Sequence, residues 1–240
     1  MNKLICLRET WNHHSAVSGF DPLFTALEQH EPGRIQSFFV PNKSGPNGLF
    51  RLWGKLWRIL KITFHDNSND NRPSPFVQEH RERVGSQVIR CAKQHPEDIV
   101  ILSAGENQYG INFMTADEAV RRRTVVCMHQ PPSWLRLNWR DFSALDGLGA
   151  IICLSHEQKN FLSSVCKSPT ILIRHGVCHD FFRPTVNKNT NASPRLLFVG
   201  HWLRDFYILA EAIQLVWREQ PKASLDCVIP RNYRSHSALL

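Results

Sequence analysis

Two apolar runs joined by a polar, proline-bounded segment constrain the fold of this 240-residue chain more than any other feature. The first run, from Ile171 to Ile173, is followed by a glycine, an aromatic pair and Pro184. Asparagine, lysine, threonine and serine dominate the segment up to Pro194, and the second run ends at Gly200. A buried strand, a linker and a fresh strand ending in glycine are expected where one α/β domain passes into another across a cleft.

Short apolar runs alternate with helical patterns along the rest of the chain. This alternation predicts the α/β class, with a Rossmann-like parallel sheet covered by helices on both faces. A capping box of Ser155 and Gln158 begins one helix, and Asp21 with Pro22 begins another. Strands are predicted at residues 3–7, 35–40, 99–102, 124–128, 150–154, 170–173, 195–199 and 223–229, helices at 76–95, 155–166 and 203–219, and polar loops at 8–19 and 66–75.

The pattern divides the chain into two domains. Residues 1–183 are predicted to form the first Rossmann-like domain, residues 184–194 the linker, and residues 195–240 the start of a second domain. A single strand–helix–strand unit is too small to bury a sheet on both faces. We therefore expect the second domain to be incomplete, so that the chain is a fragment or a shortened relative of a larger protein.

Charge and cysteine usage narrow the partners and the compartment. With 29 basic and 21 acidic side chains, the formal net charge of +8 indicates an anionic partner: a nucleoside diphosphate, an anionic membrane face or nucleic acid. Nucleic acid is not expected, because no Arg/Gly-rich tract, zinc-finger spacing or RNA-recognition signature is present. Seven cysteines, an odd number lying mostly in apolar runs such as those of Cys6, Cys127 and Cys153, indicate reduced thiols and a cytoplasmic protein. No apolar run approaches the ~20 residues that span a bilayer.

Four polar loops directly follow predicted strands, at residues 11–19, 103–109, 129–134 and 201–205. In open parallel sheets, ligands bind beyond the carboxyl ends of the strands. We therefore expect the chemistry of this chain to reside in these loops.

The domain crossing resembles that of the family 4 glycosyltransferases. Their crossing typically reads (N/H)GVD…F.P and then …FVG, and here His175-Gly-Val-Cys-His-Asp-Phe-Phe-Arg-Pro184 precedes Phe198-Val-Gly200. Cys178 replaces the acidic residue of that pattern, and Asp180 stands two places later. The resemblance implies the GT-B fold, with two Rossmann-like domains. It also implies transfer of a sugar from a nucleotide-diphosphate sugar to an acceptor hydroxyl, with retention at the anomeric carbon and without a metal or other cofactor.

Two residues are the catalytic candidates. His129 ends a strand and is followed by Gln130 and two prolines, so its ring is presented on a stiff loop. The resemblance implies that His129 contacts the donor sugar; alternatively, it hydrogen-bonds backbone and fixes the loop. Glu106 also follows a strand, and it either orients an acceptor hydroxyl and takes up its proton or caps a helix that begins near Asn107.

The candidates for binding the donor diphosphate lie in two other loops. Ser18 and Gly19 precede a helix, where backbone N–H groups can approach a phosphate. Gly200, His201 and Arg204 follow the first strand of the second domain, where the resemblance implies an arginine and a lysine that hold the diphosphate. Arg204 can contact phosphate through two N–H groups, or it pairs with Asp205 on the surface. The paired glutamates of the family's donor site have no counterpart before Leu240.

An amphipathic helix is predicted from Leu49 to Ile62. Leucines and the tryptophans Trp53 and Trp57 recur at helical spacing on one side, with lysines and arginines on the other. Such a helix binds peripherally to an anionic membrane face, here the inner face, or packs on its own sheet.

Other chemistries receive less support. The spacing of His175, Cys178 and His179 matches no familiar zinc pattern, and no metal is expected. The chain lacks a nucleophile elbow, a Walker loop and a dinucleotide-binding fingerprint. Two alternatives to transfer stay open: a catalytically inactive binding domain of the same fold, and a GT-B sugar-nucleotide epimerase.

Overall fold

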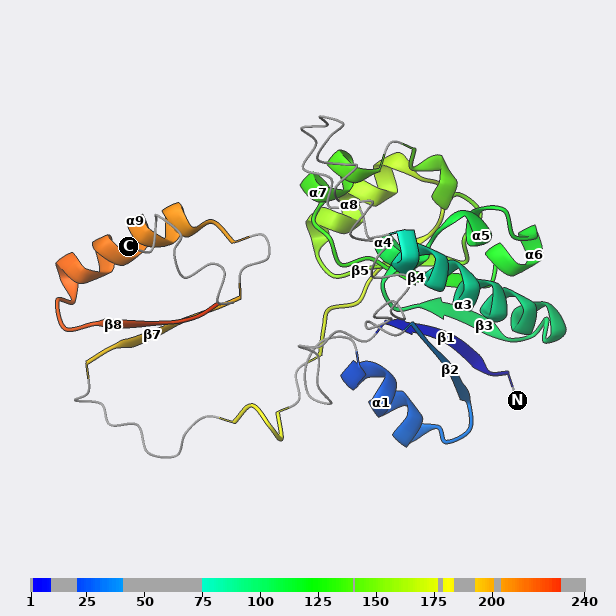
Figure 1. Ribbon diagram of the computed structural model, residues 1–240, viewed down its shortest axis with the longest axis horizontal. Coiled ribbons are helices and arrows are strands. Elements are labelled where there is room, and N and C mark those ends of the chain that lie inside the picture. Colours follow the sequence, from blue (N-terminus) through cyan, green and yellow to red (C-terminus); the bar gives the residue numbers. More distant parts are fainter. Residues whose placement is uncertain are drawn as a thin grey trace, which may run out of the picture. The chain divides into compact units, whose positions relative to one another are not determined.

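The computed structural model describes residues 2–9, 21–40, 75–139, 141–176, 179–183, 193–200 and 204–229. The chain forms two compact units, Met1–Phe182 and Arg183–Leu240 (Figure 1). The loop predicted at residues 11–19, the amphipathic helix predicted at 49–62 and most of the linker predicted at 184–194 lie outside the described residues.

The first unit is built on a six-stranded, wholly parallel sheet, which confirms the predicted fold class. The strand order is β2-β1-β3-β4-β5-β6. The strands are β1 (Leu4–Glu9), β2 (Ile35–Val40), β3 (Ile99–Leu102), β4 (Thr124–Cys127), β5 (Ala150–Cys153) and β6 (Thr170–Leu172). The helices are α1 (Asp21–His30), α3 (Pro75–Gln94), α4 (Gly105–Gln108), α5 (Ile111–Met114), α6 (Glu118–Arg121), α7 (Pro132–Asn138) and α8 (His156–Val165), with a 3-10 turn at Ser143–Leu145.

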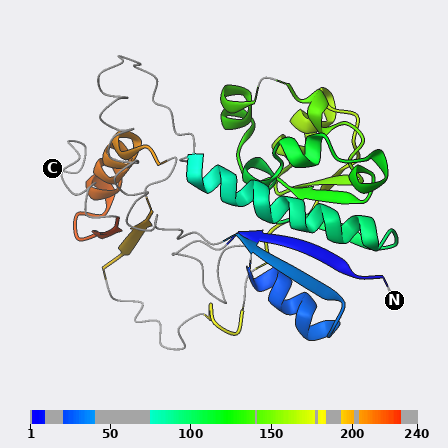
Figure 2. The same ribbon diagram turned by 45° about the vertical axis from the view of Figure 1, so that its right-hand side comes forward.

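The order of the strands reverses between β1 and β3. From β1 the chain passes through α1 to β2 on one side, and it then returns through α3 to β3 on the other side of β1. Figure 2 shows α1 and α3 on opposite faces of β1 and β2. A reversal of this kind opens a crevice at the carboxyl ends of the two strands, which is where ligands of such sheets bind.

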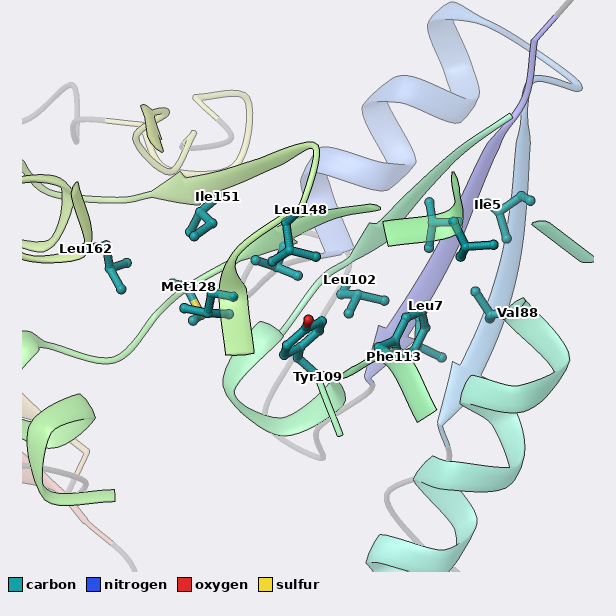
Figure 3. Packing of buried hydrophobic residues seen from close by; sticks show 14 of the residues in the cluster. Ile5, Leu7, Val88, Leu102, Tyr109, Phe113, Met128, Leu148, Ile151 and Leu162 are labelled. Carbon is teal, nitrogen blue, oxygen red and sulfur yellow. The ribbon is translucent and has the colours of Figure 1, made fainter. Parts of the chain in front are cut away.

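The core lies between the sheet and the helices that cover it on the α3 side. Ile5 and Leu7 of β1 are fully buried, and they belong to one cluster with Val88 of α3 and Leu162 of α8 (Figure 3). The long runs of buried aliphatic side chains explain why these strands could be recognised from the sequence.

The first strand is longer than predicted, because Arg8 and Glu9 are buried strand residues and not part of a polar loop. Alternating side chains point to opposite faces of a strand. Arg8 contacts Glu28 of α1 at 3.1 Å and lies over the ring of Phe24, 5.1 Å from its centroid. Glu9 forms an ion pair with Arg81 of α3. Because each of these charged side chains has a partner of opposite charge, it can be buried within the strand.

Three cysteines of the sheet are buried, as the apolar runs around them predict. Cys6, Cys127 and Cys153 are free and buried. Burial raises the pKa of the Cys6 and Cys127 thiols to about 12, so these thiols are protonated and unreactive at neutral pH.

Two arginines tie together the amino-terminal edge of the sheet. Arg123, directly before β4, donates hydrogen bonds to the carbonyl oxygens of Ala92, His95, Asp98 and Ala119. Arg121 donates to the carbonyl oxygens of Ala144 and Asp146, which precede β5. These guanidinium groups therefore have a structural role far along the sheet from the strands' carboxyl ends.

The second unit is a parallel strand–helix–strand element, as predicted. It comprises β7 (Arg195–Val199), α9 (Phe206–Glu219) and β8 (Ser224–Val228). The helix begins at Phe206 and not at Leu203, because an Asp205 carboxylate oxygen accepts the N–H groups of Tyr207 and Ile208. Phe206 in turn packs on Phe198 of β7, with ring centroids 5.6 Å apart.

A search of the described part of both units finds no helix with the length and apolarity needed to cross a membrane.

Replacement of Arg123 by alanine tests the structural role of this arginine. We expect Arg123→Ala to lower the free energy of unfolding by about 2–4 kcal/mol, because several carbonyl groups lose a charged donor at once. Urea denaturation followed by far-UV circular dichroism measures the change. The neighbouring Arg122→Ala variant is the matched control: its ion pair with Glu118 is 72% exposed on both sides, and a change of no more than about 0.5 kcal/mol is expected. Equal effects of the two substitutions would contradict the assignment.

Candidate functional site

Polar side chains collect at the carboxyl edge of the first unit's sheet, at the reversal of strand order and beside it. Glu9 ends β1, Ser103 and Glu106 follow β3, and His129 with Gln130 follows β4. The rule for parallel sheets places ligands here. Two of the four loops predicted as functional, those beginning at residues 103 and 129, are therefore brought together at this edge.

His129 is held by a backbone group and by a second histidine. Its Nε2 lies 2.7 Å from the carbonyl oxygen of Ser103. Since a carbonyl oxygen only accepts, Nε2 carries the proton of this hydrogen bond. The ring also stacks on His175, which follows β6, with centroids 5.3 Å apart and planes inclined by 16°. Burial lowers the pKa of His175, which favours the neutral ring in this stack at neutral pH.

Glu106 makes contacts that neither sequence interpretation anticipated. The helix in which it lies, α4, begins at Gly105 and not near Asn107. One carboxylate oxygen of Glu106 accepts the backbone N–H groups of His129 and Gln130, the latter at 2.5 Å. The carboxylate thus fixes the loop after β4.

The pKa of Glu106 is shifted by opposing effects. Burial raises the pKa of the carboxyl group, and the backbone N–H groups of Gln130, Glu106 and His129 partly oppose the rise. The negative charge of Glu9 adds to the rise. The charge of one carboxylate at this edge of the sheet therefore disfavours ionisation of Glu106.

Buried glutamine and serine side chains extend this anchoring to the neighbouring loops. Ser103 Oγ accepts the N–H of Glu9 and a hydrogen bond from Gln108 Nε2, both at 3.3 Å. Gln158 Nε2 donates to the carbonyl of Gln130 at 2.8 Å, and its Oε1 accepts the N–H of Leu154 at 2.7 Å. These bonds link the loops after β1, β3, β4 and β5.

The predicted capping box at α8 is half right. Ser155 Oγ accepts the N–H of Gln158 at 3.1 Å, as expected of an N-cap. The side chain of Gln158 reaches back to Leu154 and not to Ser155. The amide nitrogen of the same Gln158 side chain donates a hydrogen bond to the carbonyl oxygen of Gln130.

Glu9 and Arg81 are site residues that the sequence interpretation missed. Their side chains are only 3% and 10% exposed and form an ion pair between β1 and α3. A signal was available: Ile5, Leu7 and Glu9 share one face of a strand, so the register predicts that Glu9 points toward the covering helix.

The donor-binding candidates are only partly described. Ser18, Gly19 and His201 lie outside the described residues. Gly200 has φ +92°, a left-handed conformation that favours glycine, and its N–H donates to the Val228 carbonyl at 2.9 Å. Arg204 is exposed, and none of the ion pairs between described residues joins it to Asp205, whose carboxylate caps α9. The surface pair weighed for Arg204 is therefore not formed.

Within the described ranges, no group of three or more histidine, cysteine, aspartate or glutamate residues is placed to hold a metal ion. Of the three residues weighed as ligands, Cys178 lies outside those ranges.

No protein-family model matches the chain, and no curated protein matches it significantly. Solved structures do match. The N-terminal domain of Candida albicans trehalose-6-phosphate phosphatase matches with a TM-score of 0.55 at 11% identity, over 95% of this chain and 64% of that one. An α,α-trehalose-phosphate synthase (UDP-forming) from Burkholderia vietnamiensis matches with a TM-score of 0.53 at 11% identity, over 96% of this chain and 65% of that one.

A third match is the lipopolysaccharide outer core galactosyltransferase WaaB in its apo form, with a TM-score of 0.48 at 13% identity, over 99% of this chain and 71% of that one.

The two trehalose-metabolism proteins have the GT-B glycosyltransferase fold, and their likeness to this chain agrees with the predicted fold. At 11% identity it shows the fold and not the family. The chain spans less than two thirds of the length of the first two neighbours.

Truncation of Glu106 tests its anchoring role. We expect Glu106→Ala to lower the free energy of unfolding by about 2–4 kcal/mol, because the N–H groups of His129 and Gln130 lose their acceptor. Glu106→Gln keeps an acceptor oxygen, and a loss of at most about 1 kcal/mol is expected. Urea denaturation of both variants at one pH makes the comparison. An alanine variant as stable as the parent chain would exclude the anchoring role.

The raised pKa of Glu106 predicts a pH dependence of stability. Its folded-state pKa lies above the ordinary value of 4.5. The favourable contribution is therefore complete below that value and is lost as the pH rises through the folded-state pKa. The free energy of unfolding of the parent chain minus that of Glu106→Gln should fall as the pH rises above about 4.5. A difference that rises over this range would contradict the assigned direction.

Proposed function

We propose that this chain has the activity of a glycosyltransferase, moving a sugar from a nucleotide-diphosphate sugar to an acceptor hydroxyl. Retention at the anomeric carbon and independence of a metal belong to the same proposal, through the resemblance of the domain crossing. The observation that carries it is the hydrogen-bonded set of polar residues at the carboxyl edge of a sheet of the GT-B class. This edge, beside the reversal of strand order, is the ligand-binding position of such sheets.

His129 contacts the donor sugar in this proposal, and Glu106 positions it. The carboxylate holds the backbone at His129 and Gln130, and Ser103 fixes the tautomer of the ring. A site acts on a transition state only when its groups are held in place beforehand. Glu106 then influences transfer through the orientation of His129, in place of direct contact with an acceptor.

In the proposal the diphosphate is bound by residues of the second unit, Gly200, His201 and Arg204, whereas a phosphate-binding role for Ser18 and Gly19 of the first unit stays a prediction of the sequence. Arg204 is exposed, and its guanidinium fits a phosphate group. Stabilisation of the negative charge on the leaving diphosphate supplies the main catalytic effect.

A specific observation supports a second candidate, a binding domain of the same fold that transfers nothing. The carboxylate of Glu106 is occupied by backbone N–H groups, and Nε2 of His129 by a backbone carbonyl. These contacts serve a scaffold as well as they serve a catalyst. The two candidates differ in whether a bound nucleotide sugar is turned over.

Calorimetric titration of the 240-residue chain with UDP and with GDP tests the proposed function. We expect one nucleotide to bind with a Kd in the micromolar range, about −8 kcal/mol, and His129→Ala to weaken the binding of the corresponding nucleotide sugar about tenfold, or 1.4 kcal/mol. His30→Ala is the matched control, because His30 is exposed at the end of α1, which leads to the amino end of β2. If the folded chain binds neither UDP nor GDP, the donor site is excluded.

Release of the nucleoside diphosphate from the nucleotide sugar that binds then separates the two candidates. Release that depends on His129 supports transfer. Binding without release, in the presence of sugar acceptors, supports the binding domain.

A further inference from the structure

A buried ion pair stands at the reversal of strand order without a role in the donor site. Glu9 is the last residue of β1, and Arg81 reaches it from α3. Both side chains are at most 10% exposed. The strand end is itself fixed, because the N–H of Glu9 donates to Ser103 Oγ. A buried ion pair is weak evidence for stability, because desolvation of the two charges opposes their attraction.

The pair leaves two hydrogen-bonding positions open. Glu9 uses Oε1 to accept from Nη2 of Arg81. Its other oxygen, Oε2, and Nε of Arg81 are buried and have no hydrogen-bond partner. Buried polar atoms are nearly always paired, so an open acceptor and an open donor in one ion pair call for a ligand or a water.

We propose that Glu9 and Arg81 bind one hydroxyl group of a sugar acceptor. The inference rests on the proposed glycosyltransferase function and names residues for its acceptor side. A hydroxyl donates one hydrogen bond and accepts others, so it can donate to Glu9 Oε2 and accept from Arg81 Nε. A phosphate or carboxylate would be repelled by Glu9, and an ammonium group by Arg81. A neutral, hydroxyl-bearing ligand therefore fits the pair.

The surroundings of the pair agree with such a subsite. Glu9 lies close enough to Glu106 to affect the pKa of that carboxyl group, and Glu106 holds the loop of His129. A hydroxyl bound to Glu9 is therefore placed at the same sheet edge as His129. Both open atoms are closed to solvent, so a sugar reaches them only when the surrounding side chains move.

A structural clamp and a bound water are the alternatives to a sugar hydroxyl at this ion pair. In the first, Glu9 and Arg81 serve only to fasten α3 onto β1. In the second, a single ordered water bridges the two open atoms. A clamp predicts that variants lose stability and nothing else. If a water occupies the position, substitution of Glu9 should leave the affinity for sugars unchanged.

Saturation-transfer NMR of the complete chain with four neutral sugars tests the proposal: D-glucose, D-galactose, D-mannose and N-acetyl-D-glucosamine. We expect one of them to bind, and Glu9→Gln to weaken it about tenfold or more through loss of the charged acceptor. Arg81→Lys keeps the positive charge and lacks Nε, and it should weaken the same sugar. Glu28→Gln is the matched control, because it breaks the Arg8–Glu28 pair on the opposite face of β1 and should change nothing.

Analogues of the sugar that binds keep the test decisive if Glu9→Gln does not fold. At one ring position, both the deoxy and the fluoro analogue should lose about tenfold in affinity for the parent chain, because neither donates a hydrogen bond. Where Glu9→Gln folds, that loss should vanish in the variant. Binding of none of the four sugars to the folded parent chain, or equal binding to Glu9→Gln, would overturn the proposal.

Titration of the same samples with UDP and GDP separates this inference from the proposed function. Nucleotide binding without sugar binding contradicts the acceptor subsite and leaves the proposed transferase function standing. Sugar binding that depends on Glu9 without nucleotide binding preserves the subsite and removes the transferase.

Discussion

Backbone groups at the ends of buried parallel strands need partners that water cannot supply, and much of this structure follows from how they are satisfied. At the amino ends, Arg121 and Arg123 donate to carbonyl oxygens. At the carboxyl ends, Ser103, Glu106 and Gln158 accept from N–H groups of neighbouring loops. The sheet is thus bounded on both edges by polar side chains that bond to backbone, and the candidate site is assembled from those of the carboxyl edge.

The same pairing changes the meaning of the positive charge. A net charge of +8 suggested an anionic partner, but several arginines are engaged inside the fold. Arg121 and Arg123 are partly buried and donate to backbone carbonyls, whereas the ion pairs of Arg8 and Arg81 remove one charge of each sign and leave the net charge unchanged. The charge count therefore overstates how basic a surface a ligand meets. Arg204, exposed and named for the donor site, carries more weight for that question than the total.

Local patterns predicted the strands well and the contacts at the site poorly. The aliphatic run from Ile99 to Leu102 predicts a buried strand, and β3 is found there. His129 could be selected because it directly follows a similar run. The bond from Glu106 to His129 spans 23 positions, so it depends on which strands are neighbours. A charge usually ends a strand, and this predicts a loop at Glu9. The alternation with Ile5 and Leu7 indicates the direction of this side chain, but its partner Arg81 on α3, 72 positions away, cannot be read from a local pattern.

The anchors at the carboxyl edge bond to main-chain atoms and not to the side chains that would meet a ligand. Glu106 holds the amides of residues 129 and 130, Gln158 the carbonyl of 130 and the amide of 154, and Ser103 the amide of residue 9. Any residue other than proline presents the same amide. The positions that face a substrate can therefore be exchanged during evolution without loosening the framework, so one scaffold can acquire new specificities while few residues stay the same.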